Sequence, residues 1–245
     1  MKPYHAFYIG FDRREAAAFA VAKYSLNKHL ITPVPVRGLV LSELRAKGLY
    51  TRPTEYRDGR IIDVLSKRAD YDGAISTEFA NSRFLVKELA KTGWAIFMDC
   101  DMLVRSNVER LFKVLDPSKA VMVVKHDFQP SEGVKMDGQI QTRYARKNWS
   151  SFCAVNCDHP ANAALTVELV NSVPGRDLHA FCWLKDEDIG ELDASWNWLV
   201  GHSSDEIDPD IVHFTDGIPT MEGYEECAFA DEWRAALESW AAHSR

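Results

Sequence analysis

The chain has 245 residues, a length that is typical of one or two domains. Hydrophobic residues make up 46% and charged residues 27%, which allows a substantial buried core and excludes a disordered chain. Because 36 Asp and Glu residues outnumber 29 Lys and Arg residues, the formal net charge is −7, which argues against the basic face that duplex DNA requires. We therefore expect no nucleic-acid partner. A polyanionic ligand would have to be held locally, by a metal ion or by a few basic residues.

Targeting signals and cysteine usage bear on the compartment. No apolar run approaches the roughly 18–20 residues of a membrane span, and the apolar stretch near the start is too short for a signal peptide. The sequence therefore predicts a cytoplasmic protein without a transmembrane segment. The five cysteines are odd in number and include no C-x-x-C pair, which favours reduced, mostly buried thiols over disulfides or structural zinc.

The first half of the chain alternates between strand and helix patterns. We expect strands over residues 4–9, 34–40, 94–98 and 120–125. Helices are expected over residues 13–29, from about 76 to 93, and over 107–115, and residues 48–75 have the composition of a loop. This alternation predicts an α/β fold with an open sheet.

The second half is less regular. Residues 127–148 have the composition of a polar loop, with basic side chains at Lys135, Arg143, Arg146 and Lys147. Later elements are expected as a strand over 151–156, a helix over 160–172, a short strand over 211–214 and an amphipathic helix over 230–242. No linker separates two units, so we expect a single domain over residues 1–245 with an elaborated C-terminal half.

The segment Asp99-Cys100-Asp101 follows directly after the apolar strand predicted at 94–98. In extended backbone, residues i and i+2 point to the same side, so both carboxylates would stand together at the sheet edge where open α/β sheets bind ligands. Two close carboxylates repel unless a cation lies between them. Hard oxygen ligands suit Mg²⁺ or Mn²⁺. A solvated acidic turn is the alternative interpretation.

Other candidate residues are weaker by themselves. His213 lies in the short predicted strand and is either structural or the nitrogen ligand of a mixed site, which would favour Mn²⁺ somewhat. Asp186 and Glu187 begin a run of three acids that is either an exposed helix start or a set of groups acting on a polar substrate. Arg83 is either an ordinary surface residue or, because it falls on or near the buried face of its helix, a residue that needs an anionic partner such as a phosphate or carboxylate. Asp12, after the first strand, is placed to meet a ligand at the same edge.

Several common site motifs are missing from the sequence. There is neither a G-x-x-x-x-G-K-[ST] loop nor a G-x-G-x-x-G turn after the first strand, so the usual nucleotide-binding loops are not present. The sequence also lacks a G-x-S-x-G elbow and an H-E-x-x-H helix. The candidate chemistry therefore concentrates on the acidic pair.

Taken in chain order, the segments resemble those of GT-A-fold glycosyltransferases, most closely glycosyltransferase family 8. The matching segments are Tyr8 to Asp12, Arg83 with the strand that leads into Asp99-Cys100-Asp101, Phe152 to Asn156, Asp186-Glu187-Asp188, Trp196-Asn197, and His213-Phe214-Thr215-Asp216-Gly217. Each motif is weak, but their shared order over about residues 5–225 is fairly specific. The resemblance implies a GT-A-like sheet, mixed and mainly parallel, flanked by helices, and a metal-dependent retaining hexosyltransferase.

The family implies a role for each matching position. Asp99, Asp101 and His213 would hold Mn²⁺ or Mg²⁺ on the diphosphate of a UDP- or GDP-linked sugar. Asp186 and Glu187 would be the catalytic carboxylates near the anomeric carbon. The nucleotide sugar would also meet Gly10, Phe11, Asp12, Arg83, Asp188 and Gly217. Residues up to about 125 would form the nucleotide-binding half, about 126–229 the donor and acceptor half, and 230–245 a C-terminal helix.

Three departures from the family indicate a divergent branch. Family 8 commonly has Gln where Glu187 stands and a Lys-Pro-Trp-like ending where this chain has Ile218-Pro219-Thr220. Trp149-Ser150-Ser151 replaces the usual Asn-Ala-Gly step. The acceptor is expected to be a saccharide or glycolipid. The alternatives are a catalytically inactive nucleotide-sugar-binding regulator and a sugar-nucleotide pyrophosphorylase.

The sequence does not decide what the C-terminal helix contacts. Packing on the body of the domain is favoured, ahead of a homo-oligomer contact and of peripheral membrane contact. Its acidic neighbours disfavour an anionic bilayer surface.

Overall fold

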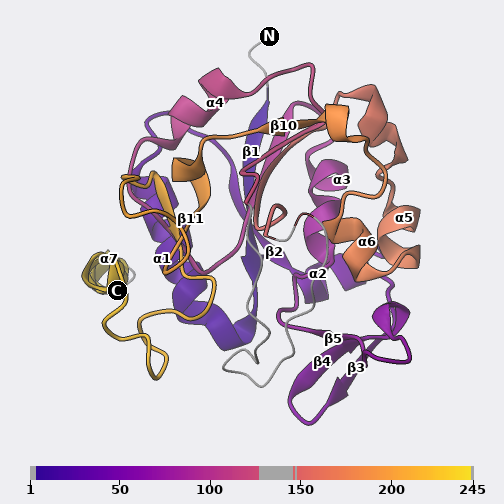
Figure 1. Ribbon diagram of the computed structural model, residues 1–245, viewed down its shortest axis with the longest axis horizontal. Coiled ribbons are helices and arrows are strands. Elements are labelled where there is room, and N and C mark those ends of the chain that lie inside the picture. The colour runs from indigo at the N-terminus through magenta and orange to yellow at the C-terminus, as the bar shows by residue number, and fades with distance from the viewer. Residues whose placement is uncertain (1–3, 127–145, 147, 244–245) are drawn as a thin grey trace.

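The computed structural model describes residues 4–126, 146 and 148–243. A six-stranded sheet lies at the centre, with helices on both faces (Figure 1). In spatial order its strands are β10 (Ile189–Glu191), β8 (Val121–Val123), β9 (Phe152–Asn156), β6 (Trp94–Met98), β1 (His5–Phe11) and β2 (Val36–Val40). Within this sheet β9 is antiparallel to both neighbours, and the other pairs are parallel. The predicted α/β fold, with a mixed and mainly parallel sheet flanked by helices, is confirmed.

Strand β6 lies between β9 and β1, and all five of its residues are buried. Its continuous apolar sequence is typical of a parallel strand that is covered on both faces. The surrounding core includes residues from Ala6 to Trp233, so both halves of the sequence contribute to it. The five cysteines are free thiols, and Cys100, Cys153 and Cys157 are buried.

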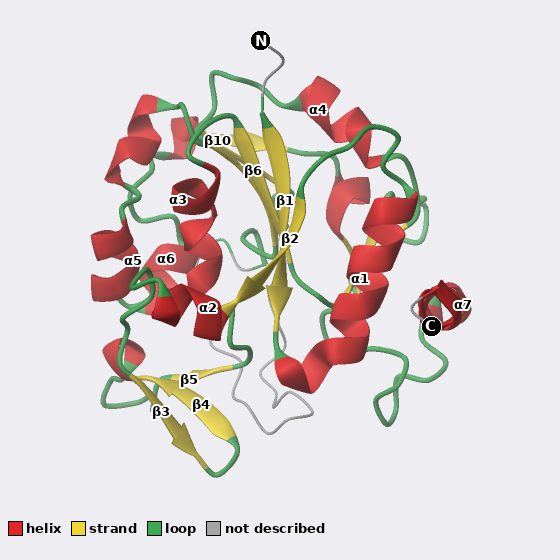
Figure 2. Ribbon diagram, turned by 180° about the vertical axis from the view of Figure 1, so that it is seen from behind, coloured by secondary structure: helices red, strands yellow, loops and turns green. Residues whose placement is uncertain are grey.

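Figure 2 shows the helices in two groups on opposite faces of the sheet. One face carries α1 (Ala16–Lys28), preceded by a 3₁₀ turn at Arg13–Glu15, and α4 (Leu111–Val114), preceded by one at Val108–Arg110. The other face carries α2 (Leu41–Ala46), α3 (Val86–Ala90), α5 (Val167–Ser172) and α6 (Gly175–His179). Helix α2 was not expected from the sequence.

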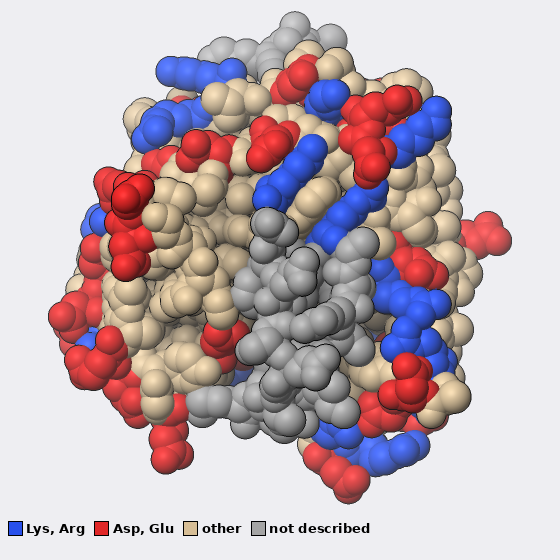
Figure 3. Space-filling view, in the orientation of Figure 1, with Lys and Arg blue, Asp and Glu red and all other residues tan. Residues whose placement is uncertain are grey.

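The C-terminal helix α7 (Ala230–His243) packs against α1, and Trp233 on it is fully buried. The favoured prediction, packing on the body of the protein, is confirmed. Acidic side chains prevail along this flank of the molecule (Figure 3). Within the described ranges, no helix combines the length and the apolar character needed to cross a bilayer.

A second sheet brings distant parts of the sequence together. It contains β11 (Trp198–Leu199), β12 (Ile211–His213) and β7 (Met102–Val104). Strand β12 pairs antiparallel with β7, which starts directly after Asp101. The main-chain nitrogen of Phe214 donates to the carbonyl oxygen of Asp101 at 2.9 Å. This pairing places His213 beside the acidic segment.

The prediction of an irregular loop over residues 48–75 is wrong. Strands β3 (Thr54–Arg57), β4 (Arg60–Asp63) and β5 (Ala74–Ile75) form a small antiparallel sheet there. A two-residue turn, Asp58-Gly59, joins β3 to β4, with φ of 51° and 75°. Positive φ at both positions is the requirement of the hairpin turn that Asp-Gly favours, so the sequence did contain the signal.

The helix predicted from about 76 to 93 is shorter in the structure. A 3₁₀ turn at Ser82–Leu85 leads into α3, and residues 76–81 are not helical. Two hydrogen bonds to the loop after β1 hold this segment instead: Arg14 donates to the Ser76 carbonyl at 2.6 Å, and the Glu78 nitrogen donates to Asp12 at 3.0 Å. Tertiary contacts therefore outweigh the local helix signal.

Of the polar loop predicted over 127–148, only residues 146 and 148 belong to the described structure. Arg146 is therefore described, whereas Lys135, Arg143 and Lys147 lie outside the described residues.

A buried ion pair fastens the small sheet to the body of the protein. Arg52 is fully buried, and its Nε donates to Asp63 Oδ1 at 3.1 Å. Its Nη1 donates to the carbonyl oxygens of Val170 and Val173 at 2.7 and 2.6 Å. The guanidinium thus connects β4 to the end of α5.

We expect Asp63→Ala to lower the free energy of unfolding by about 3–5 kcal/mol, because it leaves the Arg52 guanidinium buried without a counter-charge. Urea denaturation measures this change. Glu55→Ala, which removes an exposed partner of Lys67 on the same sheet, should have a much smaller effect. Equal losses in the two variants would contradict the importance of burial.

Candidate metal centre

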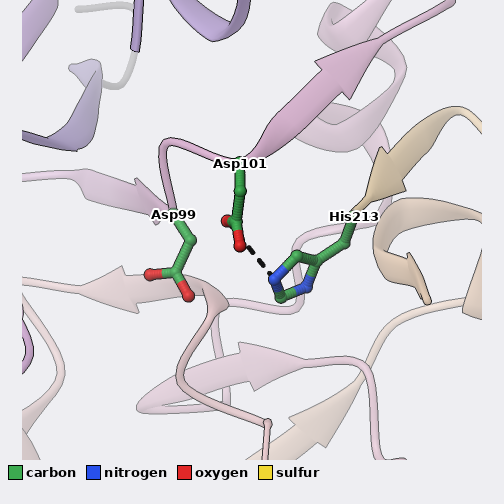
Figure 4. A group of neighbouring side chains, drawn as sticks. All are labelled: Asp99, Asp101 and His213. Atoms are coloured by element: carbon green, nitrogen blue, oxygen red, sulfur yellow. Dashed lines mark ion pairs between the residues drawn. The ribbon is translucent and has the colours of Figure 1, made fainter. Parts of the chain in front are cut away.

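Asp99, Asp101 and His213 converge at one point of the structure (Figure 4). Each offers one ligand atom, and these atoms all lie within 4.8 Å of one another. His213 Nε2 is 3.4 Å from Asp101 Oδ1, and the side chains of His213, Asp99 and Asp101 are 3%, 15% and 23% exposed. The expected meeting of these three residues, distant in sequence, is confirmed.

The acidic segment forms a turn between β6 and β7, not the extended backbone that the sequence argument assumed. Main-chain hydrogen bonds fix it instead. The nitrogen of Asp99 donates to the carbonyl of Ser151 at 2.9 Å, and the carbonyl of Asp101 accepts from Phe214. Cys100, between them, is fully buried and faces the interior. The two carboxylates consequently lie on the same side of the turn, at the carboxyl end of β6.

Arg83 has the anionic partner that its buried position requires. Its Nη1 is 2.9 Å from Asp99 Oδ1, and the same nitrogen donates to the carbonyl of Ser150 at 2.9 Å. Its guanidinium lies over the Phe97 ring, 4.7 Å from the centroid. The side chain is only 7% exposed. Asp99 is therefore held in place by a cation on its protein side.

Glu15 is a nearby carboxylate that sequence reasoning missed. Its Oε2 accepts a hydrogen bond from the Cys100 thiol at 2.9 Å. Burial, followed by the negative charge of Asp101, raises the pKa of Glu15 to about 7. The contact joins residues 85 positions apart, so no local pattern could have indicated it.

His126 is a second residue whose position the sequence did not indicate. It follows β8, and its ring nitrogen Nε2 is buried without a hydrogen-bond partner among the described residues. Burial, and then the charge of nearby His213, lowers its pKa to about 4. A neutral imidazole therefore lies near the cluster at neutral pH.

The chemistry of the donor set fits a divalent cation. Two carboxylates and an imidazole supply hard oxygen atoms and one borderline nitrogen, a combination that suits Mn²⁺ or Mg²⁺. The raised pKa of Glu15 reflects, after burial, the negative charge of Asp101 and its acidic neighbours. A cation bound there would offset that charge.

Residues 10–12 lie at the same sheet edge as Asp99, because Ile9 of β1 is level with Met98 of β6. The Asp12 carboxylate is fully buried and accepts hydrogen bonds from Arg14 and Glu78. Burial raises the pKa of Asp12, but these hydrogen bonds outweigh burial and the pKa is lowered. The carboxylate therefore shapes the loop.

The two candidate glycines are each packed under an aromatic ring. A Cβ on Gly10 would collide with Phe79, and one on Gly217 would lie 2.6 Å from the ring of Tyr224. Phe11, beside Gly10, packs edge-on against Phe19, with ring centroids 5.1 Å apart. The contacts with Phe79 and Tyr224 explain why positions 10 and 217 are glycine. Contact of residues 10–12 with a base, and of Gly217 with a diphosphate, stays a prediction.

Asp186, Glu187 and Asp188 precede β10, at the amino ends of the parallel strands, whereas Asp99 follows the carboxyl end of β6. Asp186 pairs with Arg146 and its side chain is 93% exposed. Glu187 is 75% exposed and lies 3.6 Å from Lys185, and Asp188 accepts from the nitrogen of Lys185 at 3.1 Å. The structure does not bring these acids to the cluster, and their catalytic role stays a prediction.

Comparison with known proteins identifies a relative. No protein-family model matches the sequence. An Arabidopsis thaliana protein named Protein CDI is 40% identical over 245 residues, which cover 98% of this chain and 88% of that protein. The chain belongs to the family of this Arabidopsis protein.

Solved structures show the same fold. The bifunctional glycosyltransferase WbbM matches with a TM-score of 0.62 at 12% identity, over 97% of this chain and 50% of WbbM. GlyE of Streptococcus pneumoniae TIGR4 matches with a TM-score of 0.58 at 13% identity, over 99% of this chain and 64% of GlyE. The galactosyltransferase LgtC, in complex with donor and acceptor sugar analogs, matches with a TM-score of 0.56 at 13% identity, over 96% of this chain and 95% of LgtC. The chain therefore has the GT-A glycosyltransferase fold, and spans about half the length of WbbM.

The pKa of Glu15 predicts a pH dependence of stability. The folded protein keeps this proton up to about pH 7, whereas the unfolded chain releases it near the ordinary value of 4.5. The contribution is thus fully present below pH 4.5 and lost as the pH rises through 7. We expect Glu15→Gln to lessen the fall in the free energy of unfolding between pH 5 and pH 8.

Urea denaturation with a chelator present measures this difference. Glu43→Gln, at an exposed glutamate of α2, is the matched control and should keep the wild-type pH dependence. An unaltered pH dependence in Glu15→Gln would contradict the assignment.

Proposed function

We propose that the protein is a metal-dependent, retaining glycosyltransferase of the hexosyltransferase type, related to glycosyltransferase family 8. It would move a sugar from a UDP- or GDP-linked donor to a saccharide or glycolipid acceptor. The observation that carries the proposal is the convergence of Asp99, Asp101 and His213 at the carboxyl edge of the sheet. In open α/β sheets this edge is where ligands bind. The GT-A fold shared with WbbM, GlyE and LgtC supports the same conclusion.

Asp99, Asp101 and Nε2 of His213 would hold Mn²⁺ or Mg²⁺ against the diphosphate. The ion would stabilise the negative charge that develops on the leaving phosphate as the bond to the sugar breaks. Arg83 fixes the Asp99 carboxylate from behind, so that this ligand does not have to reorient. The departing phosphate oxygen can take the acceptor proton, which removes the need for a separate histidine base.

Further donor contacts are proposed on the same edge of the sheet. Residues 10–12 follow β1 beside Asp99 and would meet the base, and Gly217, four residues after His213, would lie near the diphosphate. The catalytic role expected for Asp186 and Glu187, which is to stabilise positive charge on the sugar ring, stays a prediction, since both residues precede β10 at the opposite ends of the strands from Asp99.

Donor binding should depend on the metal. With Mn²⁺ present, a UDP- or GDP-sugar at 100 times its Kd should stabilise the protein by about 2.7 kcal/mol, or roughly 5–10 °C in Tm. Excess chelator, or Asp101→Asn, should abolish the shift. Asp70→Asn, which changes an exposed carboxylate near the small sheet, is the control and should keep it. An equal shift with excess chelator would defeat the metal assignment.

Slow hydrolysis of the donor should report turnover without an identified acceptor. We expect His213→Ala to lower the rate of sugar release by about 100-fold or more, the scale at which single electrostatic stabilisers contribute. A wild-type protein that binds donor but releases no sugar with any candidate acceptor would instead be an inactive nucleotide-sugar-binding regulator. Exchange of labelled pyrophosphate into a nucleoside triphosphate would indicate a pyrophosphorylase.

A further inference from the structure

Three hydrogen bonds lead from His213 into the protein interior. His213 Nδ1 is 3.0 Å from Asn197 Oδ1, Asn197 Nδ2 donates to Ser151 Oγ at 2.9 Å, and Ser151 Oγ donates to the carbonyl of Asn148 at 2.6 Å. Asn197 is fully buried, and His213 and Ser151 are 2% and 4% exposed. Bulk water hardly competes for these groups, so each donor has to meet an acceptor.

The last hydrogen bond fixes the direction of all three. A carbonyl oxygen only accepts, so the single hydroxyl hydrogen of Ser151 points to Asn148. Ser151 Oγ can then only accept from Asn197, and the amide nitrogen Nδ2 is the group that can donate to it. The amide oxygen of Asn197 consequently faces the imidazole. Nδ1 of His213 has to carry a hydrogen.

The other ring nitrogen of His213 faces the carboxylate pair, with Nε2 3.4 Å from Asp101 Oδ1. In a neutral imidazole whose hydrogen is on Nδ1, Nε2 presents its lone pair to the cluster, as metal ligation requires. The other neutral tautomer would set the Nδ1 lone pair against the amide oxygen of Asn197. The interior side of the ring therefore selects the form that can bind a cation.

We propose that Asn197 is a positioning residue of the metal centre. Anchored by Ser151, it holds neutral His213 in the Nδ1–H tautomer and so keeps Nε2 available to a divalent cation. The main-chain oxygen of Ser151 also accepts from the nitrogen of Asp99 at 2.9 Å, so this residue orients groups on both sides of the cluster. The inference rests on the proposed function for the identity of the ligand, whereas the tautomer is a property of the metal-free protein.

NMR of the metal-free, full-length protein with ¹⁵N-labelled histidine tests the tautomer at a pH where His213 is neutral. His213→Gln assigns the signals by their loss among the eight histidines. The wild type should show the hydrogen on Nδ1. In Asn197→Leu the side chain cannot accept a hydrogen bond from Nδ1, so part of the imidazole should carry its hydrogen on Nε2. Asn197→Asp restores an acceptor, and the hydrogen should again be found on Nδ1. Exclusive Nδ1–H in folded Asn197→Leu would overturn the proposal.

Mn²⁺ affinity, followed by electron paramagnetic resonance, tests the consequence for the site. Asn197→Leu should weaken Mn²⁺ binding by about 10- to 100-fold, the usual effect of losing the partner of a ligating histidine. Asn197→Asp should recover most of that loss. Ser151→Ala keeps the carbonyl that holds Asp99 and should weaken binding by a smaller factor, which preserves the test if Asn197→Leu does not fold.

Asn162→Leu is the matched control. Asn162 is also fully buried, and its Nδ2 donates to the carbonyls of Ala120 and Asn156, at the other end of β9. This variant should lose stability but keep both the tautomer and the Mn²⁺ affinity. Unchanged affinity in both Asn197→Leu and Ser151→Ala would overturn the proposal. Failure of the wild type to bind Mn²⁺ would overturn the proposed metal dependence and leave the tautomer result standing.

Discussion

Two carboxylates, Asp99 and Asp101, are held together at the end of a fully buried strand, where their negative charges repel each other. Arg83 balances Asp99 from the protein interior, at 2.9 Å. Asp101 faces His213, and Glu15, next to this pair of acids, keeps its proton up to about pH 7. The fold thus accepts a concentration of negative charge that an ordinary core would exclude. The proposed binding of a cation rests on this concentration of charge.

The geometry of the cluster depends on strands of different direction. The parallel strands β1 and β6 bring their carboxyl ends to one edge, and antiparallel β9 begins at that edge with Ser151 just before it. The second sheet supplies His213 through the pairing of β12 with β7. Main-chain hydrogen bonds fix the strands and the turn that carry these residues. Arg83 and Asn197 then contact the side chains of Asp99 and His213. The two carboxylates and the imidazole are therefore held close together.

The sequence allowed the central fold to be predicted where elements are apolar and local. The run at 94–98 is strand β6 without any change of boundary, and the acidic pair after it identified the site. Contacts between residues distant in sequence decide the structure elsewhere, and local patterns do not predict them. Residues 76–81 are held by Arg14 and Asp12 instead of forming a helix. Glu15 lies near the site through its contact with Cys100. The proposed roles of Asn197 and Ser151 depend on the hydrogen bonds from His213 to Asn197 and from Asn197 to Ser151. The hairpin at Asp58-Gly59 is different, because its turn signal was local and was overlooked.

The reversal of β9 has a consequence for how such a protein can diversify. Because β9 runs antiparallel to β6 and β8, its first residue, Phe152, lies level with Met98 at the end of β6, on the edge where Asp99 stands. Ser150 and Ser151, just before β9, can therefore contact Arg83 and Asp99 while the strand registers and the apolar interior stay unchanged. A strand parallel to β6 would begin at the opposite edge and would bring no such residues to the acidic pair. Substitutions just before β9 can consequently alter the surroundings of the acidic pair on an unchanged scaffold.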